Sequence, residues 1–210
     1  MPYQNRVTPF GEIIATSARG LLTGNRGCLH DKQQRIRRPY QTVRWIICLL
    51  DFKGIRRRIM TPGLWTELFF LDEATALAAG HRPCAYCQRD RFNLFRELWT
   101  QANPERVGQG LPSAPQIDAV LHRERITDKG EKMTYAEQVG RLPTGAFVTE
   151  TVGGSAYVVV NGVLWRWQPE GYTSPKPWPA ESVVQVLTPQ SVVKLLAQGY
   201  PVGLHPSVQK

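Results

Sequence analysis

The sequence predicts an α+β fold, and three observations carry that prediction. A nearly continuous run of apolar and β-branched residues occupies positions 42–52. Helix-forming segments surround a Cys-x-x-Cys motif at 84–87, and an Asn161-Gly162 pair separates two apolar runs near the C-terminus. These patterns predict a buried strand, short amphipathic helices and a type I′ hairpin, respectively. We therefore expect a small sheet with flanking helices, followed by an antiparallel β hairpin element that a helix closes.

Composition places the chain among globular proteins. It has 210 residues, of which 42% are hydrophobic and 20% charged, which suits one domain or two small ones. It contains no apolar run near the ~18 residues of a spanning helix and no signal-peptide pattern, so we expect a soluble, cytoplasmic protein without a membrane partner. Its four cysteines are too few for a disulfide scaffold.

Positive charge is concentrated in the first half of the chain. Residues 1–100 carry 16 Lys and Arg against 8 Asp and Glu, whereas residues 101–210 carry 10 against 9. The segment 32–58 alone holds nine basic residues and one acid. Such a block suits a polyanion such as nucleic acid, although a solvated basic face is the alternative. The candidate nucleic-acid-binding residues are Arg35, Arg37, Arg38, Arg44, Lys53, Arg56, Arg57 and Arg58.

The first expected elements form a hairpin. The strand 42–52 ends at a tight Lys53-Gly54 turn, after which residues 55–60 can return as a second strand. That return would place the three consecutive arginines on an exposed ribbon. Trp45 is expected in the core, whereas Tyr40 and Trp65 flank the basic segment and could stack on bases.

Two short helices are expected on either side of the cysteine motif. Residues 66–71 predict a strand, and Asp72 is a plausible N-cap for a helix that ends near Ala79. Gly80 suits the left-handed position after that helix, and Pro83 prevents its continuation. A second helix can begin at Gln88, with an apolar face at 92, 95 and 99.

The remainder predicts a linker and a β-rich end. We assign 1–102 to a basic domain, 103–140 to a linker with a short helix at 116–126, and 141–210 to a C-terminal β element. Thr188 and Pro189 are expected to begin a final helix as cap and first residue, and Gly199 to end it. This end repeats the strand, cap, helix and glycine order of residues 66–80.

The central stretch resembles a known family. Phe69-Phe70, Asp72-Glu73-Ala74 and the AAGHRPCAYC run at 78–87 resemble the zinc-binding N-terminal domain of Ada, a bacterial DNA methyl-phosphotriester repair protein and transcriptional regulator. The resemblance covers about residues 43–99. It implies an Ada-like small sheet, DNA binding, a role in DNA repair, and zinc held by Cys84 and Cys87. The first cysteine pair of that family has no counterpart here, so no residue matches its methyl-accepting thiol.

A structural zinc site needs four ligands, usually thiolates and imidazoles. We expect Cys28 and Cys48 to complete the site with Cys84 and Cys87, while His30 and His81 are further candidates. Two alternatives remain: a motif kept by packing without metal, and a reactive dithiol. The motif also fits half of a zinc deaminase signature, but the His-x-Glu at 122–124 follows it instead of preceding it.

These observations favour a non-enzymatic nucleic-acid-binding protein with a zinc knuckle. One alternative is an enzyme acting on nucleic acid or on a phosphorylated small molecule; its acid–base candidates are His81, His122, Glu67, Asp72 and Glu73. Another is a protein-interaction module that uses the C-terminal aromatic residues Trp165, Trp167, Tyr172 and Trp178.

Overall fold

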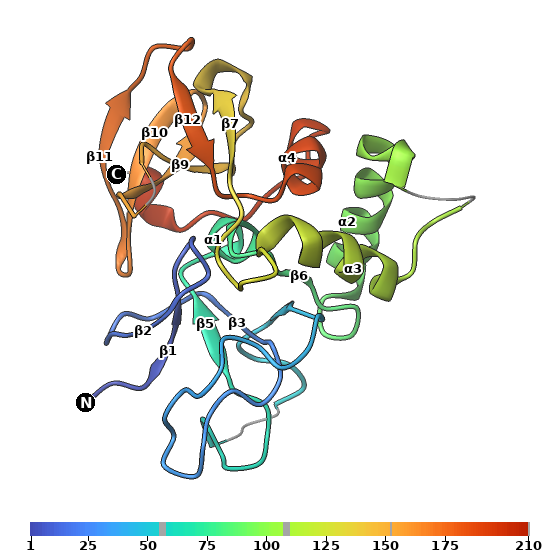
Figure 1. Cartoon of the computed structure of the whole chain (residues 1–210), viewed down its shortest axis with the longest axis vertical. Helices are drawn as coiled ribbons and strands as arrows, with labels where there is room; N and C mark the ends of the chain where they lie inside the picture. The colour runs from blue at the N-terminus through green and yellow to red at the C-terminus, as the bar shows by residue number, and fades with distance from the viewer. Residues whose placement is uncertain (55–57, 107–109, 152, 210) are drawn as a thin grey trace.

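The structure is a computed structural model of the whole chain, and it describes residues 1–54, 58–106, 110–151 and 153–209. In this part of the chain two six-stranded sheets are combined with four α-helices, which confirms the α+β class (Figure 1). No helix among these residues is long and apolar enough to cross a membrane.

The first sheet is built from short strands of the N-terminal half. Its order is β2-β1-β5-β3-β4-β6, with parallel pairing between β1 and β5 and between β4 and β6. All other neighbours in this sheet are antiparallel. The strands are β1 (Gln4–Val7), β2 (Ile13–Ala15), β3 (Leu22–Asn25), β4 (Ile46–Cys48), β5 (Leu68–Phe70) and β6 (Arg82–Pro83).

The strand predicted at 42–52 is much shorter than expected, and residues 58–60 of its predicted hairpin partner form no strand. Only Ile46–Cys48 forms a strand, and both of its edges are already occupied, by β3 and β6. Leu49 and Leu50 are exposed, so the apolar run continues past the strand onto the surface. Residues 55–57, the start of the expected return strand, lie outside the described residues.

Helix α1 (Glu73–Ala78) lies at the centre of the molecule, between the two sheets (Figure 1). All six of its residues are buried. Asp72 caps it as predicted, because the carboxylate accepts a hydrogen bond of 2.8 Å from the Thr75 N–H. Gly80 follows with φ of +85°, the left-handed conformation expected of it.

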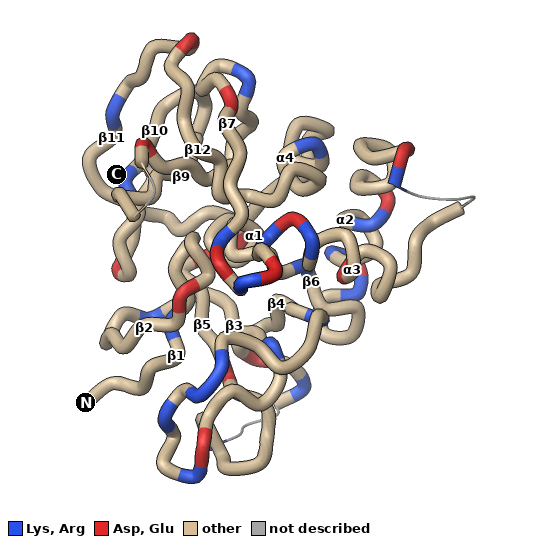
Figure 2. Tube along the Cα trace, viewed as in Figure 1, with Lys and Arg blue, Asp and Glu red and all other residues tan. Residues whose placement is uncertain are grey.

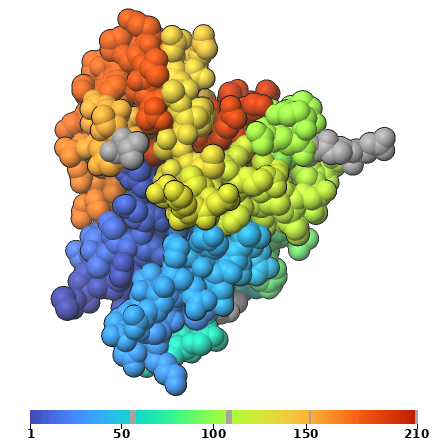
Figure 3. Space-filling view, in the orientation of Figure 1, coloured from blue at the N-terminus to red at the C-terminus, as the bar shows by residue number. Residues whose placement is uncertain are grey.

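Three further helices pack beside the first sheet. Helix α2 (Arg89–Ala102) buries Phe92, Phe95 and Trp99 on the predicted face. Helices α3 (Ala114–Arg125) and α4 (Gln190–Ala197) join the same apolar core. The C-terminal end of α3 contacts the loop before β4, where Arg125 donates a hydrogen bond of 2.6 Å to the Val43 carbonyl. Figure 3 shows the two segments meeting on one face.

The second sheet is antiparallel throughout and has the order β11-β10-β9-β8-β12-β7. Its predicted hairpin forms at Asn161-Gly162, where both residues have positive φ as a type I′ turn requires. The edge strand β7 comes from within the segment 103–140. The strands are β7 (Tyr135–Gln138), β8 (Phe147–Thr149), β9 (Ala156–Val160), β10 (Val163–Gln168), β11 (Gly171–Pro177) and β12 (Val183–Val186).

The start of α4 differs from the prediction. Pro189 precedes the helix instead of being its first residue, and no side chain caps it. The Thr188 hydroxyl points elsewhere: it accepts a hydrogen bond of 2.9 Å from the Phe147 N–H in β8. Gly199 ends the helix with φ of +86°, as expected.

Candidate metal centre

Three cysteines form a compact thiol group. The sulfur atoms of Cys48, Cys84 and Cys87 all lie within 4.8 Å of one another, and each residue is half-buried. In a tetrahedral zinc–thiolate unit with bonds of about 2.3 Å, neighbouring sulfurs are about 3.8 Å apart. Sulfur atoms that all lie within 4.8 Å of one another are therefore close to the spacing that such a metal ion requires.

Strand pairing brings the third cysteine to the motif. β4 and β6 run parallel, and Ile47 is paired with Pro83. The next residue of each strand is a cysteine, so the register sets Cys48 beside Cys84. A hydrogen bond of 2.9 Å from the Cys84 N–H to the Ile47 carbonyl extends the same ladder.

The turn that carries Cys84 and Cys87 is held in place by α2. Gln88, the residue before this helix, donates 2.8 Å from its side chain to the Ile47 carbonyl in β4. The Tyr86 N–H lies 3.4 Å from the Cys84 sulfur and donates to it. Backbone N–H groups around a sulfur favour the thiolate, and so does a helix N-terminus close by.

The three thiols titrate as a group. A hydrogen bond from the Cys48 thiol, with backbone N–H donors in support, lowers the pKa of Cys84 to about 5. The same contact with Cys84, together with burial, raises the pKa of Cys48, and burial raises the pKa of Cys87. The lowered pKa favours the thiolate form of Cys84, and a bound cation would favour ionisation of the other two thiols.

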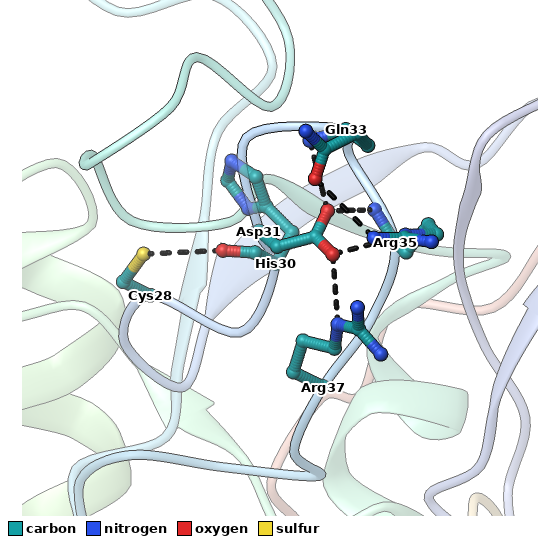
Figure 4. Close-up of polar contacts among 6 residues, drawn as sticks. All are labelled: Cys28, His30, Asp31, Gln33, Arg35 and Arg37. Atoms are coloured by element: carbon teal, nitrogen blue, oxygen red, sulfur yellow. Dashed lines mark hydrogen bonds and ion pairs between the residues drawn. The ribbon is translucent and has the colours of Figure 1, made fainter.

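Cys28 does not join this group. Its sulfur instead lies 3.8 Å from the His30 carbonyl, in the loop after β3 (Figure 4). Among the described residues, the cluster with metal-ligand spacing contains Cys48, Cys84 and Cys87 alone. The expectation of four cysteine ligands is thus supported for three of them.

Neither candidate histidine lies in the thiol group. The His30 ring contacts the Thr66 hydroxyl at 2.6 Å and the Thr61 carbonyl at 3.2 Å. His81 is fully buried, and its Nε2 accepts a hydrogen bond of 3.1 Å from Arg26. Burial, with Arg26 nearby, lowers the pKa of His81, so that its ring stays neutral.

Two of the predicted nucleic-acid-binding arginines have a local acidic partner. Asp31 accepts hydrogen bonds from Arg35 at 3.0 Å and from Arg37 at 2.7 Å (Figure 4). The Arg35 N–H and these guanidinium groups lower the pKa of Asp31. Asp31 is the residue directly before the basic segment 32–58, so its charge is not included in the balance of that segment.

The other predicted basic residues are more dispersed. Arg38, Arg44, Lys53 and Arg58 are exposed, whereas Arg56 and Arg57 lie outside the described residues. Figure 2 shows basic positions along the loops at the lower end of the molecule. No ribbon of arginines is seen in the described part of this segment; its exposed cations are spread over several loops.

The proposed acid–base residues are occupied by structural contacts. The Asp72 carboxylate accepts hydrogen bonds from Tyr172 at 2.6 Å and from the His205 N–H at 2.9 Å. The Glu73 carboxylate forms an ion pair with Arg91 and accepts a hydrogen bond of 2.7 Å from Tyr200. These contacts join α1 to α2, β11 and the C-terminal tail.

The two remaining acid–base candidates are also bonded within the fold. Glu67 is buried, and its carboxylate accepts a hydrogen bond of 2.8 Å from the Met60 N–H. His122 accepts a hydrogen bond of 2.9 Å from Arg125. Glu67 alone of the five lines the same cavity as the three cysteines.

Trp45 is a core residue, as predicted. It is 2% exposed, and two guanidinium groups lie over its ring, with centroid distances of 3.9 Å for Arg26 and 3.8 Å for Arg125. Cations over an indole face are attracted by its quadrupole. No sequence signal pointed to these two arginines, which are separated by almost a hundred residues.

The C-terminal aromatic residues are largely part of the second core. Tyr172 is buried, and Trp165 and Trp167 pack against the same cluster of apolar residues. Trp178 packs beside Tyr157, with ring centroids 6.2 Å apart. Arg166, between the two tryptophans, is exposed, and the alternation of side chains along a strand sets it on the opposite face.

Comparisons of the chain with protein-family models, with curated proteins and with solved structures find no match. The resemblance to the Ada zinc domain therefore remains a prediction from the quoted motifs.

Proposed function

We propose that this protein binds one zinc ion through Cys48, Cys84 and Cys87. The observation that supports the proposal is the convergence of three sulfurs, one from β4 and two from the turn after β6, within 4.8 Å. Thiolates prefer soft or borderline metal ions, and zinc takes such ligands at tetrahedral sites. When bound, the ion would join β4 to the turn before α2.

Metal content per chain tests this proposal. Protein purified without a polyhistidine tag should contain about one zinc ion per chain, and Cys48→Ser and Cys84→Ser should each lose it, because three ligands already make a minimal set. Cys28→Ser is the matched control and should keep its zinc, since Cys28 lies outside the group. Wild-type protein without metal, or equal zinc in all variants, would contradict the proposal and leave packing or a dithiol as the role of the motif.

Nucleic-acid binding is a second candidate function. The exposed basic residues of the segment 32–58 favour it, in particular Arg38 and Arg44, for which the structure gives no ion pair with any described acid. Phosphate contacts by Lys and Arg release counterions, so binding must weaken with salt. The protein partner suggested for the C-terminal aromatic residues has less support, because those rings pack mainly into the second core.

Binding of labelled single-stranded and double-stranded oligonucleotides at 50 and 200 mM salt tests this candidate. The double variant Arg38→Glu with Arg44→Glu should bind at least ~10-fold more weakly and with a smaller salt slope. The matched control carries Arg141→Glu with Arg166→Glu, the same charge change in the C-terminal half of the chain. Binding that is weak and insensitive to salt, or equal loss in both double variants, would exclude this surface.

A further inference from the structure

The thiol group forms part of the wall of a cavity. This cavity has a volume of about 510 Å³, and Cys48, Cys84 and Cys87 all line it. Ligand sites of small molecules commonly measure ~300–1,000 Å³. A zinc ion that keeps three protein ligands has a fourth position for water or for a substrate atom. Here that position would face a space large enough for a small molecule.

Aromatic side chains from separate segments line the same cavity. They are Phe52, Trp65, Phe69 and Tyr86. The rings of Phe52 and Tyr86 meet edge to face with centroids 5.1 Å apart, although Tyr86 is 61% exposed. Rings in this arrangement provide faces on which a planar ligand can stack.

Acidic residues line the cavity, and a lysine lies beside two of its aromatic rings. Asp51 and Glu67 are among the residues that line the cavity, and the hydrogen bond from the Met60 N–H fixes one carboxylate oxygen of Glu67. Carboxylates accept hydrogen bonds from the amino groups of heterocyclic bases. The ammonium group of Lys53 lies 5.4 Å from the centroids of both Phe52 and Tyr86, where it could meet a phosphate.

We propose that this cavity binds the ring of a nucleobase, with a ring nitrogen or exocyclic group occupying the fourth coordination position of the metal. The inference rests on the proposed zinc site and names the ligand class that this site accepts. Imidazole-like nitrogen atoms are ordinary zinc ligands, the aromatic rings supply stacking, and Glu67 supplies a fixed acceptor. The base could come from a free nucleoside or from a single strand of nucleic acid.

Cobalt-substituted protein allows the metal site and the base site to be tested separately. Thiolate-to-cobalt charge-transfer bands report the three-cysteine site by itself, whereas the ligand-field bands respond to a change of the fourth ligand. Adenosine, cytidine, a short single-stranded oligonucleotide and the same strand with abasic positions are then titrated into the full-length protein. The ligand-field bands should change with a nucleoside or with the intact strand, and not with the abasic strand.

The response to each probe identifies the source of the base. A change with nucleosides alone points to a small-molecule ligand, and a change with the intact strand alone points to nucleic acid. Tyr86→Leu should weaken binding ~5-fold to 150-fold, the range for loss of one stacking ring. Tyr3→Leu is the matched control, because Tyr3 is 42% exposed and does not line the cavity.

Two results would overturn the inference in different ways. If the charge-transfer bands form but no base at millimolar concentration alters the ligand-field bands, the base site is excluded and the metal site stands. Failure of cobalt to give charge-transfer bands would overturn the metal site, and the base site with it.

Discussion

Two segments of this protein have the same local design and different surroundings. β5, α1 and Gly80 form one, and β12, α4 and Gly199 form the other; both glycines have almost the same φ, +85° and +86°. All six residues of α1 are buried between the sheets, whereas α4 buries four of its eight. A short sequence pattern therefore determines how each helix ends, but not how deeply the helix is buried or which segments it contacts.

The starts of the two helices differ most. Asp72 accepts four hydrogen bonds, from the N–H and hydroxyl groups of Thr75, the Tyr172 hydroxyl and the His205 N–H. Thr188 accepts one, from the Phe147 N–H, and does not cap α4. The Asp72 carboxylate thus joins α1 to the second sheet and to the C-terminal tail, whereas the Thr188 hydroxyl joins only the start of α4 to β8.

The largest expected effect is that of Asp72→Ala. It leaves buried donors unpaired, and each such group costs ~1–3 kcal/mol, so the free energy of unfolding should fall by about 3 kcal/mol or more. Thr188→Val should cost about 1–2 kcal/mol, because one buried N–H loses its acceptor. Urea denaturation of both variants measures the difference. Equal losses would mean that α1 has no special role in joining the sheets.

Gly80→Ala and Gly199→Ala compare the two helix ends. Both force alanine into a left-handed conformation, which costs ~1 kcal/mol. A Cβ at Gly80 would also lie 2.5 Å from Cδ of Arg125, whereas a Cβ at Gly199 would meet nothing within 4 Å. We expect a loss of about 2–3 kcal/mol for Gly80→Ala and ~1 kcal/mol for Gly199→Ala. A similar urea midpoint for the two variants would show that Arg125 can move aside.

Lys132, which contacts α1, should make the stability of the protein depend on pH. Its ammonium group donates to the Ala78 carbonyl at the end of α1, and burial, together with Arg26 and Arg125, lowers its pKa from 10.5 to about 7. Below pH 7 the lysine is charged in both folded and unfolded chains, and the full cost of burying that charge is present. Between pH 7 and about 10.5 the unfolded chain binds more protons, so stability should rise with pH.

Lys132→Met should reduce this rise of stability with pH. It should also increase the free energy of unfolding at pH 6 by on the order of 1 kcal/mol, because one pKa unit corresponds to ~1.4 kcal/mol and the lost hydrogen bond offsets part of the gain. The smallest effect is expected for its counterpart at α4. Lys194 pairs with Glu105 at 2.7 Å on the surface, and Lys194→Met should leave the thermal midpoint nearly unchanged at both pH values. A pH profile unaffected by Lys132→Met would contradict burial of its charge.

Several features were predictable because they depend on neighbours in the chain. The Asp72 cap, the left-handed glycines, the apolar face of α2 and the hairpin at Asn161-Gly162 all follow from local conformational preferences. The neighbours of β4 were not predictable in this way. An apolar run of eleven residues indicates burial, but it does not say which strands will occupy the two edges, and here β3 and β6 take both.

The sequence by itself determined the local geometry around the thiol motif: a capped helix, a glycine that ends it, a proline, two cysteines and a second helix. Only the tertiary structure decided which other residues meet there. Parallel pairing of β4 with β6 brings Cys48 to the motif and leaves Cys28 in a loop, and Asp31 binds two arginines of the basic segment. The physical reason is that torsional preferences and hydrogen bonds between near neighbours act within a few residues, whereas strand register and burial depend on segments far apart in the chain.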